Sequence, residues 1–332
     1  MKIILNVIFT LFVFSQMAFG QQKALEDYLP VLPEVKTDAL NVDPNKGYLV
    51  KKLKPNVYLL TDGIWQSAFV TTGKGVVLLD APESYGAHIQ KAVAEVTAEP
   101  IRKLVYTHSH VDHIGGSHNL KEIKGLEIWA LQSVADYLKE KDDPRPLLPT
   151  KTFGKKHALR FGTATIELEN HGNYHSDEGN LSVYLPQSKF LMVIDVLAPG
   201  YVPFKGLDLS SNIHEYLQIF DRILAYDFNV FLGGHLTYPG VRKDVELTKE
   251  YVEDLHATVK RIHAETNPLQ VMDEAAEEVG WDNKYLLFKV FLEDVVDRSA
   301  KEIESRWRNR LTGVDVWSQS HCEAMLVYVR WD

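Results

Sequence analysis

The stretch that decides how this chain folds is Thr107-His108-Ser109-His110-Val111-Asp112-His113-Ile114-Gly115-Gly116. It places three histidines and one aspartate directly after an apolar run, Leu104 to Tyr106, that predicts a buried strand. Imidazole and carboxylate ligands together suit zinc, iron or manganese and need no thiolate. In an extended or turning segment His108 and His110 project to the same side and can share one ion. Asp112 and His113, just past the turn, can then face a second ion.

Two ions need more ligands than this motif holds, so the sequence predicts further ligands in later segments. Three candidates each lie near the end of a predicted strand, where loops expose side chains: His175, Asp195 and His235. The paired glycines before His235 allow the backbone to crowd a site. An ordinary loop or turn residue is the alternative for each, and it is the opening motif that favours ligands.

The remaining pattern alternates strands and helices in two similar blocks. We expect strands at residues 56–61, 67–72, 76–80, 102–107, 127–130, 164–169, 181–185, 190–194 and 230–232, and helices at 84–97, 116–123, 133–139 and 211–226. This order predicts stacked sheets with helices outside. After Gly240 apolar residues recur at helical spacing from Val245 to Ile262, and further helices are predicted at 271–278 and 284–310, with a short closing strand at 325–330.

The N-terminus has the pattern of a secretory signal. Lys2 precedes an apolar run from Ile3 to Phe14, and Ala18-Phe19-Gly20 forms a small-x-small cleavage site. Cleavage after Gly20 predicts a periplasmic or secreted protein with no membrane span after removal of the signal; an uncleaved anchor is the alternative. The predicted division is a signal peptide (1–20), an extended arm (21–46), a core (47–240) and a helical extension packed on that core (241–332).

Charge argues against nucleic-acid binding, and cysteine content excludes an internal disulfide. The formal charge is −9, and loss of Lys2 with the signal gives 35 basic minus 45 acidic residues, or −10. A chain this acidic is a poor candidate for nucleic-acid binding. Cys322 is the single cysteine, so no internal disulfide can form.

The strand-end Asp80, the His-x-His-x-Asp-His motif, a lone His, a strand-end Asp and Gly-Gly-His together resemble the metallo-β-lactamase fold superfamily over most of residues 50–240. The resemblance implies an α/β (α+β) fold: a four-layer αββα sandwich, here with a C-terminal helical extension, holding metals at one edge. It assigns His108, His110 and His175 to a first metal and Asp112, His113 and His235 to a second. Asp195 would bridge the two, and Asp80 would orient the motif loop, with a plain strand-terminating turn as its alternative.

What the resemblance implies for function is a dinuclear zinc hydrolase, with iron or manganese as alternative metals. A hydroxide bridging the metals would attack an ester, lactone, thioester or β-lactam-like bond of a small molecule. Asp112 would hold one ion and orient the nucleophile, which makes it the catalytic candidate. Three tyrosines near ligand segments are candidates to donate a hydrogen bond to substrate, with aromatic wall packing as the alternative: Tyr174, Tyr201 and Tyr238.

The substrate is less specified. Zinc β-lactamases commonly place Cys at the position of Asp195 and a Lys soon after it, whereas Val196-Leu197-Ala198-Pro199 follows here. The all-His/Asp set is more similar to the glyoxalase II and lactonase branches. Two other classes stay open: a mononuclear iron enzyme similar to persulfide dioxygenases, and a metal-retaining binding module without turnover. The helical extension would cap the active-site mouth, form a homodimer contact, or pack on its own domain.

Overall fold

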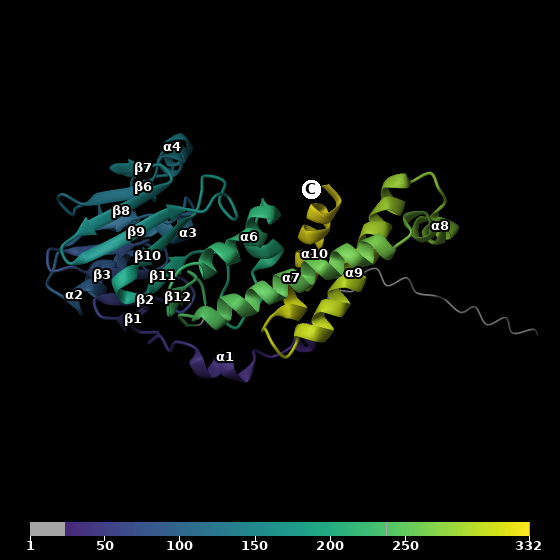
Figure 1. The fold of residues 1–332 in the computed structure, drawn as a ribbon, viewed down its shortest axis with the longest axis horizontal. Coiled ribbons are helices and arrows are strands. Elements are labelled where there is room, and N and C mark those ends of the chain that lie inside the picture. Colours follow the sequence, from purple (N-terminus) through teal and green to yellow (C-terminus); the bar gives the residue numbers. More distant parts are fainter. Residues whose placement is uncertain (1–23, 237, 332) are drawn as a thin grey trace, which may run out of the picture.

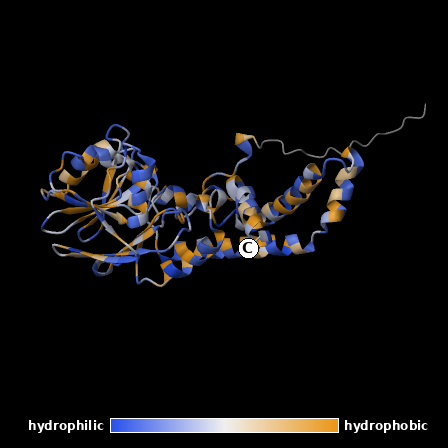
Figure 2. Cartoon of the chain, turned by 90° about the horizontal axis from the view of Figure 1, so that it is seen from above, coloured by the Kyte–Doolittle hydropathy of each residue, from blue (hydrophilic) through white to orange (hydrophobic). Residues whose placement is uncertain are grey.

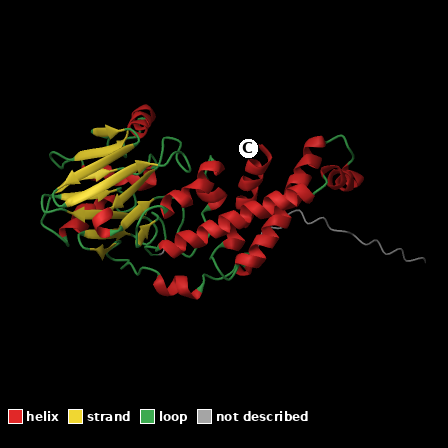
Figure 3. Cartoon of the chain, viewed as in Figure 1, coloured by secondary structure: helices red, strands yellow, loops and turns green. Residues whose placement is uncertain are grey.

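The computed structural model describes residues 24–236 and 238–331, so the predicted signal peptide lies outside the described residues. The molecule is elongated, with strands gathered at one end and long helices extending to the other (Figures 1 and 3). Within the described part no helix is both long and apolar enough to cross a membrane.

The first sheet has seven strands in sequence order. They are β1 (Leu49–Lys54), β2 (Val57–Thr61), β3 (Gln66–Thr71), β4 (Val76–Leu79), β5 (Ile101–Val105), β6 (Glu127–Leu131) and β7 (Lys151–Phe153). Neighbours from β1 to β4 pair antiparallel, whereas β4 to β7 pair parallel. The parallel part needs crossovers, which contain α2 (Ile89–Ala94), α3 (Val111–Ile114) and α4 (Gln132–Lys141). Strand β1 was not predicted because its lysines hide the apolar alternation at this sheet edge.

The second sheet has five strands in the order β12-β11-β10-β9-β8. Their bounds are β8 (Lys156–Phe161), β9 (Ala164–Asn170), β10 (Leu181–Leu185), β11 (Phe190–Val193) and β12 (Val230–Leu232). Along β11, Phe190 and Met192 join the apolar cluster shared with the first sheet, while Leu191 and Val193 join a second cluster with the C-terminal helices. Alternate residues therefore bury both faces of the sheet. This arrangement confirms the predicted stack of two sheets between helices.

Shorter elements connect these layers. They are the 3₁₀ helices η1 (Leu25–Asp27), η2 (Gly86–His88), η3 (Gly115–Leu120) and η4 (Pro186–Ser188), and the helices α1 (Pro33–Asp38), α5 (Lys205–Leu209) and α6 (Ile213–Leu224). The predicted helix at 84–97 is thus a single turn followed by α2, and the predicted helix at 116–123 is the 3₁₀ segment η3. The N-terminal arm crosses to the extension, where the Leu29 amide donates to Asp315 Oδ2 at 2.8 Å.

The C-terminal extension consists of α7 (Arg242–Glu265), α8 (Pro268–Val279), α9 (Lys284–Trp307) and α10 (Val314–Trp331). Hydrophobic and hydrophilic stretches alternate along these helices (Figure 2), as expected when one face of each is buried. Val245 of α7, Val295 of α9 and Met325 of α10 lie in one buried cluster with Phe231 of β12. The extension and the second sheet therefore share a core.

The predicted strand at 325–330 is wrong, because this segment is the last part of α10. Ser318, His321, Cys322 and Met325 are buried at helical spacing, so the apolar stripe continues from the preceding turns. Val327 points outward. Tertiary packing of the stripe outweighs the strand preference of the valines and Tyr328.

Candidate metal centre

Strand ends place the predicted ligands at one edge of the stacked sheets. Strands β4 and β5 are parallel, so their carboxyl ends meet at the same edge, where β5 leads into Thr107 and His108. From the second sheet, β11 leads into Asp195 and β12 into His235. The amide of Asp195 donates to the carbonyl of Gly233 at 3.0 Å, which ties these two strand ends together.

The first group of ligand atoms belongs to His108, His110, His175 and Asp195, which all lie within 4.8 Å of one another. His175 Nε2 is 2.8 Å from His110 Nδ1 and 3.1 Å from Asp195 Oδ2. His108 Nε2 is 3.3 Å from the same carboxylate oxygen. These are the residues that the resemblance assigned to a first metal, together with the proposed bridge.

The second group is Asp112, His113 and His235, again within 4.8 Å of one another. His113 Nε2 lies 2.9 Å from His235 Nε2, and Asp112 Oδ2 lies 3.6 Å from the first and 3.7 Å from the second. Asp195 reaches this group as well, with Oδ2 at 3.2 Å from His113 Nε2 and Oδ1 at 3.0 Å from His235 Nε2. The structure thus brings all seven predicted ligand residues together around one carboxylate.

The chemistry of this cluster fits divalent cations. His108 Nε2 and Asp195 Oδ1 are buried and form no well-aligned hydrogen bond with the described residues, although they lie 3.3 Å from Asp195 Oδ2 and 3.0 Å from His235 Nε2 respectively. A buried polar atom ordinarily has such a partner. Burial lowers the pKa of His108 to about 3, which keeps that imidazole neutral, as a metal ligand must be. Burial alone would raise the pKa of Asp195, but the charges of His113, His175 and His235 hold it well below its usual value. The two ligand groups supply imidazole nitrogens and share the ionised carboxylate of Asp195. This donor set suits zinc, manganese or iron.

Two of the aspartates at this site, Asp80 and Asp195, have strained backbone conformations. Asp195 has a φ of 55° and Asp80 a φ of 64°, in the left-handed region that residues other than glycine rarely occupy. Gly234, beside His235, has a φ of +95°, and a Cβ there would lie 2.8 Å from Ile194 Cγ2 and 3.1 Å from His113 Cε1. The paired glycines are thus needed where the sequence predicted them, because the β12 loop runs against the second group.

Asp80 lies where it can orient the motif loop. Its carboxylate accepts from the Thr107 amide at 2.8 Å and from the Thr107 hydroxyl at 2.7 Å. Thr107 Oγ1 in turn lies 3.0 Å from His108 Nδ1. Burial raises the pKa of Asp80 to about 7, against the opposing effect of His113 and of these hydrogen bonds. Thr107 is a positioning residue that the sequence reasoning passed over, although it is part of the quoted stretch.

Trp65 is a second residue that the sequence did not reveal. Its indole Nε1 donates to Asp112 Oδ2 at 3.2 Å, and its backbone pairs with that of His235. The adjacent Gln66 amide donates to the Gly234 carbonyl at 2.7 Å. This loop therefore supports the second group from a position 47 residues before Asp112. A lone Trp in a turn gives no sequence signal for such a contact.

Asp208 is a third such residue. Its carbonyl oxygen lies 2.5 Å from His175 Nδ1, although 33 residues separate the two. Asp208 is part of α5, in which four consecutive residues, 206 to 209, have φ between 55° and 60°. Left-handed backbone costs about 1–2 kcal/mol for each residue that has a Cβ. The surrounding structure must therefore hold this turn in place.

The structure places the three predicted substrate-binding tyrosines in different surroundings. Tyr174 is almost fully buried and its hydroxyl donates to the Ile194 carbonyl at 2.7 Å, so that hydroxyl is not free to reach a substrate. Tyr201 pairs through its backbone with Thr312, which lies between α9 and α10 of the extension. The Tyr238 hydroxyl lies beside Gly200, and burial, followed by the charge of Asp244, raises its pKa to about 12. A role of these three tyrosines in substrate binding stays a prediction.

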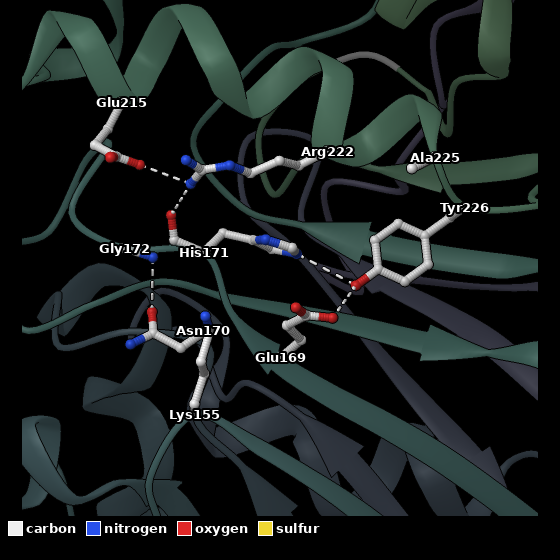
Figure 4. Close-up of a pocket in the computed structure, with 9 residues that line it drawn as sticks. All are labelled: Lys155, Glu169, Asn170, His171, Gly172, Glu215, Arg222, Ala225 and Tyr226. Carbon is white, nitrogen blue, oxygen red and sulfur yellow. Dashed lines mark hydrogen bonds and ion pairs between the residues drawn. The ribbon is translucent and has the colours of Figure 1, made fainter.

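A hollow of about 890 Å³ is lined mostly by residues of β9, α6 and the segments that follow them (Figure 4), and by none of the seven ligand residues. The Arg222 guanidinium extends into it and donates to Glu215 Oε2 at 2.6 Å and to the His171 carbonyl at 2.7 Å. Burial lowers the pKa of His171 to about 4. His171 is the first residue of the loop between β9 and β10, which also contains His175, so Arg222 fixes the start of a loop that holds a ligand.

Comparison with known proteins gives a family match and several relatives. Residues 60–235 match the sequence profile of the metallo-beta-lactamase superfamily. A 2,4-dinitroanisole O-demethylase subunit alpha from Nocardioides sp. (strain JS1661) is 23% identical over 187 residues, 55% of this chain and 56% of that protein. A metallo-beta-lactamase type 2 from Bacillus cereus is 28% identical over 200 residues, 56% of this chain and 75% of that protein.

Solved structures share the fold. A metallo-beta-lactamase from Pontibacter korlensis superposes with a TM-score of 0.53 at 20% identity, covering 61% of this chain and 97% of that one. A metallo beta lactamase from Hirschia baltica gives a TM-score of 0.52 at 19% identity, covering 61% of this chain and 96% of that one. The chain spans little more than half the length of the demethylase subunit and most of the length of the lactamases.

Proposed function

Because the chain belongs to the metallo-β-lactamase superfamily, we propose that it is a dinuclear zinc hydrolase that cleaves an ester, lactone or thioester bond of a small molecule. The observation that carries this proposal is the position of Asp195, whose two carboxylate oxygens lie between the two ligand groups. When bound, two such cations would lower the pKa of a shared water enough to supply hydroxide near neutral pH.

Asp112 is the residue best placed to act on the reacting water. Its side chain is 44% exposed, whereas that of Asp195 is 6% exposed, so Asp112 marks the open side of the cluster. The Trp65 indole fixes one carboxylate oxygen of Asp112. The carboxylate can therefore orient an incoming water and take up its proton while Asp195 stays buried and ionised.

Apolar side chains beside the second group favour an uncharged substrate. Ile64 and Leu236 are exposed, and the Leu236 amide donates to the Ile64 carbonyl at 2.8 Å, which sets them on either side of the Trp65–His235 pairing. The four residues after Asp195, Val196 to Pro199, contain no lysine of the kind with which zinc β-lactamases bind the carboxylate of the drug. The demethylase relative is named for an aromatic ether, and we propose aryl esters and lactones as the first substrates to test.

Two complete ligand groups favour a pair of cations over the mononuclear iron alternative. An iron centre of the persulfide dioxygenase type would use two His and one Asp, and would leave the second group without a role. Manganese pairs are compatible with the same nitrogen and oxygen donors. The number and identity of the bound metals therefore distinguish the hydrolase from the iron enzyme.

The test is elemental analysis of purified protein, followed by chelation, cation restoration and a panel of aryl ester, lactone, thioester, phosphodiester and β-lactam substrates. We expect two zinc equivalents per chain, and hydrolysis that is lost with the cations and restored with them. Asp195→Asn should abolish turnover and reduce cation binding, whereas His157→Ala, whose ring stacks on Trp129, serves as the matched control. A single iron with oxygen consumption would replace the proposal by the redox alternative. Two bound cations without turnover of any substrate would favour a binding module.

Export is a separate part of the proposal. The apolar run and small-residue site at residues 3–20 support secretion to the periplasm or medium, with Gln21 as the new N-terminus. Mass spectrometry of the protein recovered from those fractions tests this. An intact Met1 would support an anchored form.

A further inference from the structure

Helix α10 of the C-terminal extension reaches the first ligand group through the left-handed turn in α5. We propose that α10 is a positioning element for His175, with His321 as the residue that holds the turn. The inference rests on the proposed function only in requiring that the cluster binds cations. It assigns a chemical role to a part of the chain that lies outside the family match over residues 60–235.

The turn acts on the metal ligand directly. The carbonyl oxygen of Asp208 lies 2.5 Å from His175 Nδ1, so that nitrogen donates its proton to the turn. This fixes the tautomer in which Nε2 has a free lone pair, and Nε2 is the atom that faces His110 and Asp195. Hydrogen bonds of this kind orient metal-ligating histidines and raise their affinity.

Helix α10 holds the other side of the same turn. His321 is fully buried, and its Nε2 donates to the Phe204 carbonyl at 3.0 Å. The Gly206 amide donates to Ser320 Oγ at 3.2 Å, and the Phe204 ring packs edge-on against Trp317 with centroids 5.0 Å apart. Three residues of α10 therefore contact Phe204 and Gly206, at the start of the left-handed segment.

His321 is itself fixed by the long helix of the extension. The hydroxyl of Tyr251 on α7 donates to His321 Nδ1 at 2.7 Å, which leaves Nε2 as the protonated nitrogen. Inside the turn, Asp208 Oδ1 accepts from the Phe204 amide at 3.2 Å and Asp208 Oδ2 from the Tyr216 hydroxyl at 3.3 Å. A continuous set of hydrogen bonds thus runs from α7 through α10 and α5 to the metal ligand.

The turn needs this support because its backbone is unfavourable. Leu207, Asp208 and Leu209 all have Cβ atoms in the left-handed region, a conformation that persists only where neighbours fix it. If the contact to His321 is lost, we expect the turn to relax and the Asp208 carbonyl to leave His175. The extension then determines the affinity of the first group without containing a ligand.

The experiment uses a pair of substitutions at one position in the full chain. In His321→Gln the side-chain amide nitrogen can replace Nε2 as donor to Phe204, whereas in His321→Asn it is too short to do so. Cys322→Ala is the matched control, because Cys322 is the next residue of α10 and is equally buried. The measurement is titration of chelator-treated protein with Zn²⁺ against a chromophoric competitor, together with the melting temperature of each apo-protein.

We expect His321→Asn to weaken one of the two zinc equivalents about tenfold, the lower end of what loss of such a supporting hydrogen bond causes. His321→Gln and Cys322→Ala should retain both affinities. The same substitutions in a His175→Ala background provide a double-mutant cycle. In that background His321→Asn should no longer change zinc affinity, because the imidazole through which it acts on the metal is absent.

Three results would overturn the inference. Equal zinc affinities for His321→Asn and the parent chain would remove it while leaving the proposed hydrolase intact. Loss of both equivalents in parallel with melting temperature, in all three variants, would show general destabilisation. An undiminished effect in the His175→Ala background would show another route. A parent chain that binds no zinc, manganese or iron would instead remove the proposed function itself.

Discussion

At the residue scale, the ligands could be predicted because most of them lie in one short motif or at the end of an apolar strand. His108, His110, Asp112 and His113 are separated by one or two residues, so local geometry fixes their proximity. Their supports could not be predicted, since Trp65 and Asp208 reach their partners across 47 and 33 residues. Such contacts follow from the tertiary fold and leave no local periodicity.

Trp65→Phe is the first prediction at this scale. It removes the indole N–H that donates to Asp112 Oδ2 but keeps an aromatic ring beside His235. We expect the second cation to bind about tenfold more weakly, a loss of about 1.4 kcal/mol. Competitive zinc titration measures this. Trp129→Phe is the control, since that indole donates to Glu127 at a distance from the cluster, and an equal loss in both variants would contradict the assignment.

Gly234→Ala is the second. The added Cβ would combine a positive φ with contacts to Ile194 and His113 that are shorter than van der Waals distance. Gly73→Ala is a close control, because Gly73 has a φ of +79° and no atom within 4 Å of the added Cβ. Both variants carry backbone strain of about 1–2 kcal/mol, so the excess effect of Gly234→Ala reports the steric clash. We expect lower stability and lower zinc affinity at position 234 only, and equal behaviour of the two proteins would refute this account.

At the element scale, the sequence predicted strands and helices whose apolar residues have a clear period and missed those without one. Strand β1 is an edge strand with lysines at three of its six positions, and the left-handed backbone of α5 depends on contacts with neighbouring elements. The strand predicted at residues 325–330 was wrong because it rested on the local strand preference of the valines alone. The buried stripe that runs from Ser318 to Met325 extends the helix instead.

Helix caps give a prediction at this scale. Asn283 precedes α9, and its side chain accepts from the Leu286 amide at 3.1 Å. Removing a side-chain cap costs about 1 kcal/mol, so Asn283→Ala should lower the free energy of unfolding by that amount. Urea denaturation measures it, with Asn229→Ala in an exposed loop as control. An unchanged midpoint for Asn283→Ala would show that the cap contributes nothing.

At the scale of the whole molecule, the extension and the second sheet have a common core. Phe231 and Leu191 of the sheet lie in the same buried cluster as residues of α7, α9 and α10. We therefore expect one cooperative unfolding transition, with helical circular dichroism and loss of bound zinc coinciding. Separate transitions would mean that the extension folds independently. Homodimerisation through the extension stays a prediction, which light scattering of the full chain tests.

Acid should lower the free energy of unfolding of this common core, because it protonates His321. Burial lowers the pKa of His321 to about 4, below the ordinary 6.5 that it regains on unfolding. The unfolded chain therefore binds the proton first as pH falls. Neutral His321 therefore makes its full contribution to the free energy of unfolding above pH 6.5. That contribution is lost as the pH falls towards 4, and the loss is about 3 kcal/mol at most. Urea denaturation of the parent chain and of His321→Gln measures it, and identical pH dependence in both would contradict the prediction.

The uneven burial of the two ligand groups has a kinetic consequence. In the first group the side chains of His108, His175 and Asp195 are at most 6% exposed and only His110 is half-buried. In the second group His113 is buried, but Asp112 and His235 are 44% and 31% exposed. A chelator can reach the second group from solvent, but it reaches the first only after protein atoms move. Stripping the protein should accordingly proceed in two phases, a fast loss of one ion and a slow loss of the other, and the half-stripped species should persist long enough to isolate.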